Sequence, residues 1–132
     1  MQAALVQFKP RKGDLAANLD AMRGVFAQLA DGPVELIVFP EAAMTGYFLE
    51  GAVYELAFDA PTFAAKVDAQ WRAAGGTRPV DVAIGFYENA LGTFHNSAMY
   101  VRCGGPDGVH IVHVHRKMFL PTYGVFDEER FL

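Results

Sequence analysis

Apolar residues form two short runs and one helical stripe along the first part of the chain. Residues 2–8 are mostly apolar and are followed by a Lys-Pro pair, which predicts a short strand. Asp14 stands where it can cap a helix over residues 15–30, in which apolar side chains recur at spacings of three and four. The members of this stripe are Leu15, Leu19, Met22, Phe26 and Leu29. Residues 35–39 are almost entirely apolar, as in a strand buried on both faces, so a parallel strand–helix–strand unit is predicted.

The middle of the chain predicts two helical segments followed by antiparallel strands. Helical periodicity returns over residues 50–58 and 62–74, where Phe63 and Trp71 are expected to lie in the core. Three apolar segments separated by turn-forming residues are predicted as strands, at residues 80–87, 95–101 and 109–114. Residues 115–132 show no clear period and are predicted as a loop. The fold class that follows is α/β, with a mixed sheet faced by helices.

Composition and charge exclude several classes of function. Of the 132 residues, 52% are hydrophobic and 20% are charged, which is typical of a globular domain. A net charge of −4 argues against nucleic acid as a partner, because nothing would neutralise the phosphates. No apolar run approaches the roughly 20 residues of a membrane helix, so no membrane partner is expected. The lack of a basic, signal-like start and the single cysteine, Cys103, indicate a cytoplasmic protein.

Two charged residues directly follow predicted strands. Glu41 lies just past residues 35–39, at the kind of strand end beside which α/β proteins bind ligands. The apolar strand is expected to carry this carboxylate into a poorly hydrated site, where a raised pKa would suit a general base. Lys117 follows the last predicted strand and could stabilise a developing oxyanion. For each residue the alternative is an ordinary charged group on the surface, and for Glu88 the sequence does not separate a site role from a surface one.

Four separated motifs around these residues occur in a fixed order along the chain. Residues 39–47 have the pattern Phe-Pro-Glu-x-x-x-Thr-Gly-Tyr. About seventy-five residues later, residues 116–131 have the pattern Arg-Lys-x-x-Leu-Pro-x-Tyr-Gly-x-Phe-Asp-Glu-x-Arg-Phe. Together with residues 4–19 and 94–98, these motifs resemble the nitrilase superfamily of carbon–nitrogen hydrolases. Several motifs in the same order are far more specific than any one of them.

This resemblance implies the N-terminal part of a four-layer α-β-β-α sandwich and a Glu-Lys-Cys triad that hydrolyses non-peptide C–N bonds. Carried over position by position, Glu41 would be the general base and Lys117 would stabilise the tetrahedral intermediate. Glu128 matches a second carboxylate that family members often place near the lysine. Tyr123 matches an aromatic residue that lines the pocket in the glutaminase domains of NAD synthetases, and Tyr47 is the other substrate-binding candidate. No cofactor or metal is implied.

The cysteine of that triad is missing from the sequence. Family members carry it on a strand end beyond the lysine, and nothing follows Leu132 here. Cys103 precedes Lys117 and ends a predicted strand, so packing is its expected role. We therefore expect residues 1–132 to be one carbon–nitrogen hydrolase domain that is truncated before its nucleophile. One face of its sheet would then lack cover, and the candidates for incomplete packing are Leu36, Val38, Val82 and Ile84.

Three hypotheses about function remain open from the sequence. The first is an enzyme for a small linear amide, nitrile or carbamoyl substrate, inactive as this chain alone and a homo-oligomer at full length. The second is a non-catalytic binding module that kept the scaffold and lost its nucleophile. The third is a metal-dependent hydrolase that uses His110, His113 and His115, of which the last two would share one face of a strand.

Overall fold

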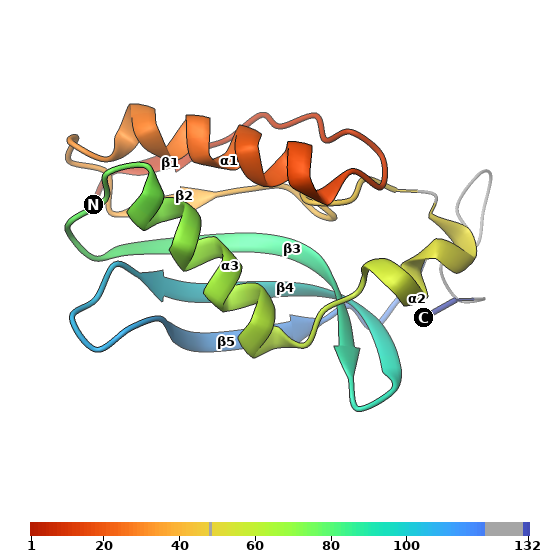
Figure 1. Cartoon of the computed structure of the whole chain (residues 1–132). Coiled ribbons are helices and arrows are strands. Elements are labelled where there is room, and N and C mark those ends of the chain that lie inside the picture. Colours follow the sequence, from red (N-terminus) through yellow and green to blue (C-terminus); the bar gives the residue numbers. More distant parts are fainter. Residues whose placement is uncertain (48, 121–130) are drawn as a thin grey trace.

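The predicted α/β class is confirmed by the computed structural model, which describes residues 1–47, 49–120 and 131–132. The described residues form a five-stranded sheet in the order β1-β2-β3-β4-β5, with two long helices on one face (Figure 1). The strands are β1 (Ala3–Leu5), β2 (Leu36–Val38), β3 (Val80–Ala90), β4 (Thr93–Cys103) and β5 (His110–Arg116). The helices are α1 (Leu15–Leu29), η1 (Glu50–Ala52), α2 (Val53–Leu56) and α3 (Ala60–Ala73). The sheet is mixed as predicted, because β1, β2 and β3 pair in parallel and β3, β4 and β5 pair antiparallel.

The ends of the helices follow their capping residues. Asp14 accepts a hydrogen bond from the backbone N–H of Ala17 at 3.1 Å, so α1 begins where the sequence predicts. Asp59 accepts from the backbone N–H of Thr62 at 2.8 Å and starts α3 slightly before the predicted position. The stretch predicted as helical over residues 50–58 divides into the 3₁₀ turn η1 and the single α-helical turn α2.

The β3–β4 hairpin extends further than the sequence predicts. The connection between the predicted strands 80–87 and 95–101 is reduced to Leu91 and Gly92, which have φ angles of 53° and 88°. Glycine adopts this left-handed conformation readily, whereas leucine is strained there. The ladder of backbone pairs therefore continues to the ends of both strands. It brings residues 86–89 opposite residues 94–97, the part of the sheet that carries most of its buried polar side chains.

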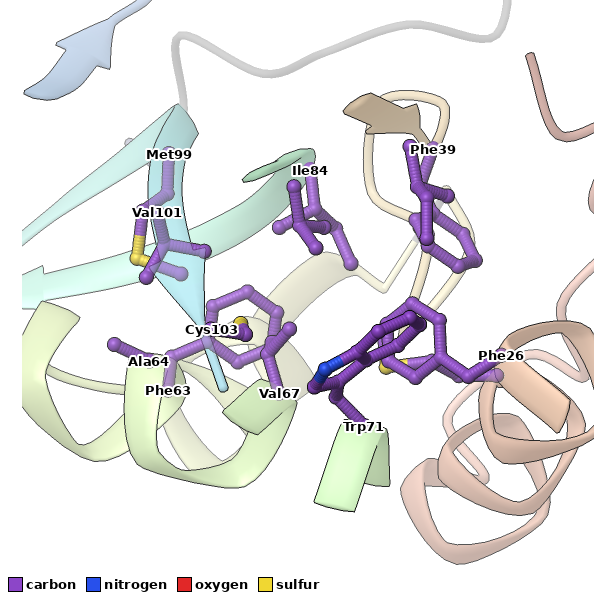
Figure 2. Packing of buried hydrophobic residues seen from close by; sticks show 14 of the residues in the cluster. Phe26, Phe39, Phe63, Ala64, Val67, Trp71, Ile84, Met99, Val101 and Cys103 are labelled. Atoms are coloured by element: carbon purple, nitrogen blue, oxygen red, sulfur yellow. The ribbon is translucent and has the colours of Figure 1, made fainter. Parts of the chain in front are cut away.

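The core lies between one face of the sheet and the helices α1 and α3 (Figure 2). Trp71 and Phe63, both predicted as core residues, are fully buried there. The Trp71 ring packs edge-on against Phe26 at a centroid distance of 5.5 Å, and its indole N–H donates to the Arg78 carbonyl at 2.9 Å. Phe63 stacks on Phe86 of β3 at a centroid distance of 4.5 Å. These contacts join both long helices and the sheet into one core.

The opposite face of the sheet, called here the open face, is less covered. Val82 and Ile84 are fully buried, so the prediction that they pack incompletely is wrong. The reason is the two-residue alternation of a strand, which turns both side chains toward the helices. Leu36 and Val38 of β2 alternate with a buried residue, lie on the open face and are half-buried, as predicted. Leu5 of β1, paired with Val38, is 78% exposed.

We expect the isolated 1–132 chain to self-associate through the open face, because exposed apolar side chains on a sheet favour association. Leu5→Lys should raise the fraction of monomer and lower the binding of a hydrophobic dye. Leu91→Lys is the matched control, since Leu91 is fully exposed at the tip of the β3–β4 hairpin. Size-exclusion chromatography with light scattering measures both effects. A wild-type chain that is monomeric and binds no dye would contradict the prediction.

Candidate active site

Glu41 lies in a turn that continues from β2 across the surface of β3. Backbone hydrogen bonds hold this turn: the Phe39 N–H donates to the Ala83 carbonyl at 2.8 Å, and the Ala43 N–H donates to the Gly85 carbonyl at 3.3 Å. The turn passes so close to Gly85 that a Cβ atom there would lie 2.5 Å from the Cα of Glu41. Glycine is therefore required at this point of the strand. The close approach fixes the backbone of Glu41 just beyond the carboxyl end of β2.

Lys117 reaches Glu41 from the far end of the sheet's last strand. It is the first residue after β5, and its backbone N–H donates to the Asn96 carbonyl of β4 at 2.8 Å. Its Nζ atom lies 2.9 Å from Oε1 of Glu41, although 76 residues separate the two in sequence. The structure thus brings together the two residues that the sequence singles out for chemistry.

Two further side chains hold the Glu41 carboxylate. The side-chain amide of Asn96 donates to Oε1 at 2.5 Å, and the Tyr47 hydroxyl donates to Oε2 at 3.1 Å. Tyr47 is predicted to bind substrate, and in this structure it contacts the carboxylate. Asn96 is missed by the sequence reasoning, although it lies inside a segment that resembles the family. Together with Lys117, these donors fix the orientation of the carboxylate.

The surroundings of Glu41 lower the pKa of its carboxyl group, so the prediction of a raised pKa is wrong. Partial burial alone would raise this pKa, but hydrogen bonds from Lys117, Asn96 and Tyr47, with the positive charge of Lys117, outweigh it. The site is also wetter than predicted, because the Glu41 and Lys117 side chains are 38% and 33% exposed. The carboxylate is therefore ionised at neutral pH.

A hollow of about 340 Å³ lies beside the Glu41–Lys117 pair. Apolar side chains of β2, β3 and β4 line it, among them Val38, Ala83 and Ala98. The polar lining includes the charged pair, Asn96 and His115. An apolar wall with a few convergent polar groups is typical of a site for a small ligand.

The other candidates from the sequence are Tyr123, Glu128 and the histidines of β5. Tyr123 and Glu128 lie outside the described residues. His113 and His115 share the open face of β5, because they lie opposite Tyr100 and Ala98. Within residues 1–47, 49–120 and 131–132, no three His, Cys, Asp or Glu side chains are grouped so that they could hold a metal ion. The metal-hydrolase hypothesis thus finds no support in the described part of the chain.

Cys103 is a packing residue, as predicted. Its side chain is fully buried in the core beneath α3 (Figure 2). Burial raises the pKa of its thiol to about 12, so the thiolate is scarce at neutral pH. Cys103 lies seven positions along β4 from Asn96, roughly 23 Å of extended chain. Cys103 is therefore out of reach of Glu41 and Lys117.

A second polar group, the Glu88 cluster (Glu88, Ser97 and Arg116), lies on the helix-bearing face of the same strands. Glu88 is only 4% exposed, and its carboxylate accepts from Ser97 Oγ at 2.9 Å. Arg116 Nε and Nη2 donate to its two oxygens at 2.8 and 3.1 Å. The Arg116 guanidinium, against the opposing effect of burial and with help from Ser97, lowers the pKa of the Glu88 carboxyl. The alternation along β3 could have predicted this cluster. Glu88 continues the inward-facing positions 82, 84 and 86, and a charge at a buried position needs a partner.

Glu88 should make the stability of the fold depend on acidity. A carboxyl whose pKa is lowered by folding contributes stability that is fully present above its unfolded pKa, about 4.3, and is lost as pH falls through the folded value. We expect Glu88→Gln to reduce the free energy of unfolding at neutral pH by about 2 kcal/mol and to flatten its decline in acid. Urea unfolding across pH measures this, with Glu35→Gln, which alters an exposed carboxylate, as control. A mutant curve that runs parallel to the wild-type curve would contradict the prediction.

The fold agrees with a comparison to known protein families. Residues 2–132 match the carbon-nitrogen hydrolase family, and the chain therefore belongs to that family. This confirms the resemblance to the nitrilase superfamily that the motifs carry. No described helix is both long and apolar enough to cross a bilayer.

The curated proteins that this chain resembles include glutamine-dependent NAD(+) synthetases and an amidase. The glutamine-dependent NAD(+) synthetase of Thermotoga maritima is 32% identical over 133 residues, which cover 99% of this chain and 21% of the relative. The (R)-stereoselective amidase of Pseudomonas sp is 36% identical over 109 residues, which cover 83% of this chain and 37% of the relative. The solved glutamine-dependent NAD+ synthetase from Acinetobacter baumannii superposes with a TM-score of 0.74 at 29% identity, over 98% of this chain and 23% of that structure. The chain thus spans about a fifth of the length of the synthetases that it matches.

Proposed function

We propose that the full-length protein hydrolyses the carbon–nitrogen bond of a small linear amide, with Glu41 as general base and Lys117 as the stabilising cation. The observation that carries this proposal is the 2.9 Å contact between Lys117 Nζ and Glu41 Oε1 beside a hollow of ligand size. Membership of the carbon-nitrogen hydrolase family supports the reaction class. The names of the relatives, a glutamine-dependent synthetase and a stereoselective amidase, favour an amide over a nitrile or a carbamoyl compound.

The nucleophile in this proposal is a cysteine outside residues 1–132, because Cys103 is buried and its thiol is not ionised. Glu41 takes the thiol proton, and the thiolate attacks the carbonyl carbon of the amide. The carbonyl oxygen becomes an oxyanion beside the Lys117 ammonium. When the intermediate collapses, the C–N bond breaks, and Glu41 gives its proton to the departing amine. Glu41 then takes a proton from water, whose oxygen attacks the thioester and releases the carboxylate product and the thiol.

The ionisation state of Glu41 supports the role of general base. Its lowered pKa keeps the carboxylate charged at neutral pH, and only the charged form can accept a proton. Asn96 and Tyr47 orient the carboxylate, and both members of the charged pair remain partly exposed. A substrate carbonyl can therefore approach base and cation together.

The test is the release of ammonia by the full-length protein from glutamine and from a panel of short-chain amides and nitriles. We expect hydrolysis of at least one amide, and block of this activity by iodoacetamide through a cysteine other than Cys103. Cys103→Ala is the matched control and should keep its activity, while the 1–132 chain alone should be inactive. Absence of hydrolysis on the whole panel, or its loss in Cys103→Ala, would contradict the proposal. A homo-oligomer at full length stays a prediction.

A further inference from the structure

Two neighbouring strands divide their polar residues between the two faces of the sheet. Strand β4 carries Asn96 and Ser97 side by side, and Arg116 and Lys117 lie beside them at the end of β5. One member of each pair contacts Glu41 on the open face. The other member contacts the buried carboxylate of β3 on the helix-bearing face. The Glu88 cluster therefore lies directly behind the candidate active site, with only the sheet between them.

A backbone hydrogen bond ties Lys117 to β4. Its N–H donates to the Asn96 carbonyl, which is the last backbone link between the end of β5 and β4. The next two residues, Met118 and Phe119, are 79% and 89% exposed. Arg116, the residue before Lys117, is the last residue of β5, so a contact that fixes Arg116 also fixes the start of the segment that carries Lys117.

The geometry of the contact between Arg116 and Glu88 is suited to fixing the position of Arg116. Two N–H groups of the guanidinium meet both carboxylate oxygens, and Ser97 Oγ donates to one of them. This two-point geometry fixes direction as well as distance, unlike the single contact of an ammonium group. The Glu88 side chain is 5% exposed and the Arg116 side chain 50%, so the carboxylate is the anchored partner.

We propose that Glu88 is a positioning residue for the hydrolytic reaction, acting through Arg116 to fix the backbone from which Lys117 reaches Glu41. The inference rests on the proposed function for its chemistry, whereas the geometry exists with or without turnover. Glu88 lies on the helix-bearing face, away from the hollow, and touches no reacting atom. Its contribution to the reaction is the placement of the Lys117 charge, which must lie where the oxyanion forms.

Acylation of lysine amines in the full-length protein measures whether Lys117 stays on Glu41. An ammonium held by a carboxylate reacts more slowly with an N-hydroxysuccinimide acetate than a released one. Peptide mass spectrometry gives the rate at Lys117 relative to the exposed Lys9. We expect Glu88→Gln and Arg116→Lys each to speed acylation of Lys117 about threefold, because a displaced ammonium is held less tightly by Glu41. Glu41→Gln gives the acylation rate of Lys117 without its contact to the Glu41 carboxylate.

Asp81→Asn is the matched control for the loss of a partly buried ion pair. Asp81 accepts from Arg102 Nε at 2.8 Å and from the Tyr100 hydroxyl at 2.7 Å, near the opposite end of β3 from Glu88. This variant should lower thermal stability and leave the acylation rate of Lys117 unchanged. Equal acceleration in Asp81→Asn would overturn the proposal, because it would show general loosening of the sheet. An unchanged rate in both Glu88→Gln and Arg116→Lys would also overturn it.

Steady-state kinetics of amide hydrolysis, taken together with the acylation rates, distinguishes failure of this inference from failure of the proposed function. In a protein that hydrolyses amides, Glu88→Gln should lower kcat about tenfold with little change in KM, because the lost stabilisation acts mainly in the transition state. Arg116→Lys keeps the charge without the two-point contact and should lie between wild type and Glu88→Gln. If no amide is hydrolysed while the acylation rates change as expected, the proposed function fails and the positioning of Lys117 stands. A wild-type kcat in Glu88→Gln with Lys117 released would overturn the role of Glu88 in the reaction.

Discussion

Glu41→Gln and Lys117→Met, each in the full-length protein, should lower kcat for amide hydrolysis about a thousandfold while the fold is retained. Glutamine has the size of glutamate but cannot take a proton from the nucleophile. Methionine replaces the apolar stem of lysine without its charge. Both wild-type side chains are about one-third exposed, so their ion pair adds only about 0–1 kcal/mol to stability. The melting temperature should therefore change little in either variant.

Glu35→Gln and Lys66→Met are the matched controls for these two substitutions. Glu35 precedes β2 at the end away from Glu41, and Lys66 lies on α3 with its ammonium over the Phe58 ring. Both controls should keep the wild-type kcat in steady-state kinetics. A near-normal kcat in Glu41→Gln or in Lys117→Met would remove that residue from the mechanism.

Gly85→Ala should lower kcat about a hundredfold, because a displacement of about 1 Å in catalytic geometry can cost that much. The new methyl group would meet backbone atoms of Glu41 and Ala42 at 2.5 to 3.0 Å, and backbone atoms cannot rotate away as the end of a side chain can. The turn that carries Glu41 must then move off β3 and away from Lys117. We also expect a loss of about 1–3 kcal/mol in the free energy of unfolding, as for other overpacked sites.

Gly24→Ala gives the matched control for this substitution. Gly24 lies in α1, and a Cβ atom there would meet nothing within 4 Å. Alanine is favoured over glycine inside a helix by about 0.5–1 kcal/mol, so this variant should be more stable and keep the wild-type kcat. Kinetics and urea unfolding of both variants provide the comparison. A wild-type kcat in Gly85→Ala would show that the close approach does not fix the position of Glu41.

The helices are predictable from the sequence because their signals are local, whereas strand ends depend on distant partners. The apolar stripe of α1 and the cap at Asp14 lie within a few residues of the ends that they define. Strands β3 and β4 continue to Ala90 and Thr93 because each supplies hydrogen bonds to the other, which no short window of sequence contains. The error at Val82 and Ile84 has a similar origin. Alternation divides a strand into two faces, but it does not say which face the helices cover.

The sequence predicts the two central residues of the candidate site, but not the pKa or the exposure of their side chains. The motifs select Glu41 and Lys117, and the two side chains are in contact. The pKa of Glu41 is lowered by Lys117, 76 positions away in the sequence, and by Asn96. The sequence around Glu41 does not show that either side chain lies beside it. The roles of Tyr123 and Glu128 stay predictions, because both residues lie outside the described part of the chain.

The alternation of side chains along β4 separates two kinds of evolutionary change. Asn96 and Ala98 turn their side chains toward the open face, whereas the Ser97 side chain contacts Glu88 and Met99 is buried in the core. Adjacent codons therefore alter either the surroundings of a ligand or the interior of the domain, and seldom both at once. A lineage can change the substrate that it accepts by single substitutions on the open face while the core beneath stays intact. Such a route would let one scaffold give rise to enzymes with different substrates.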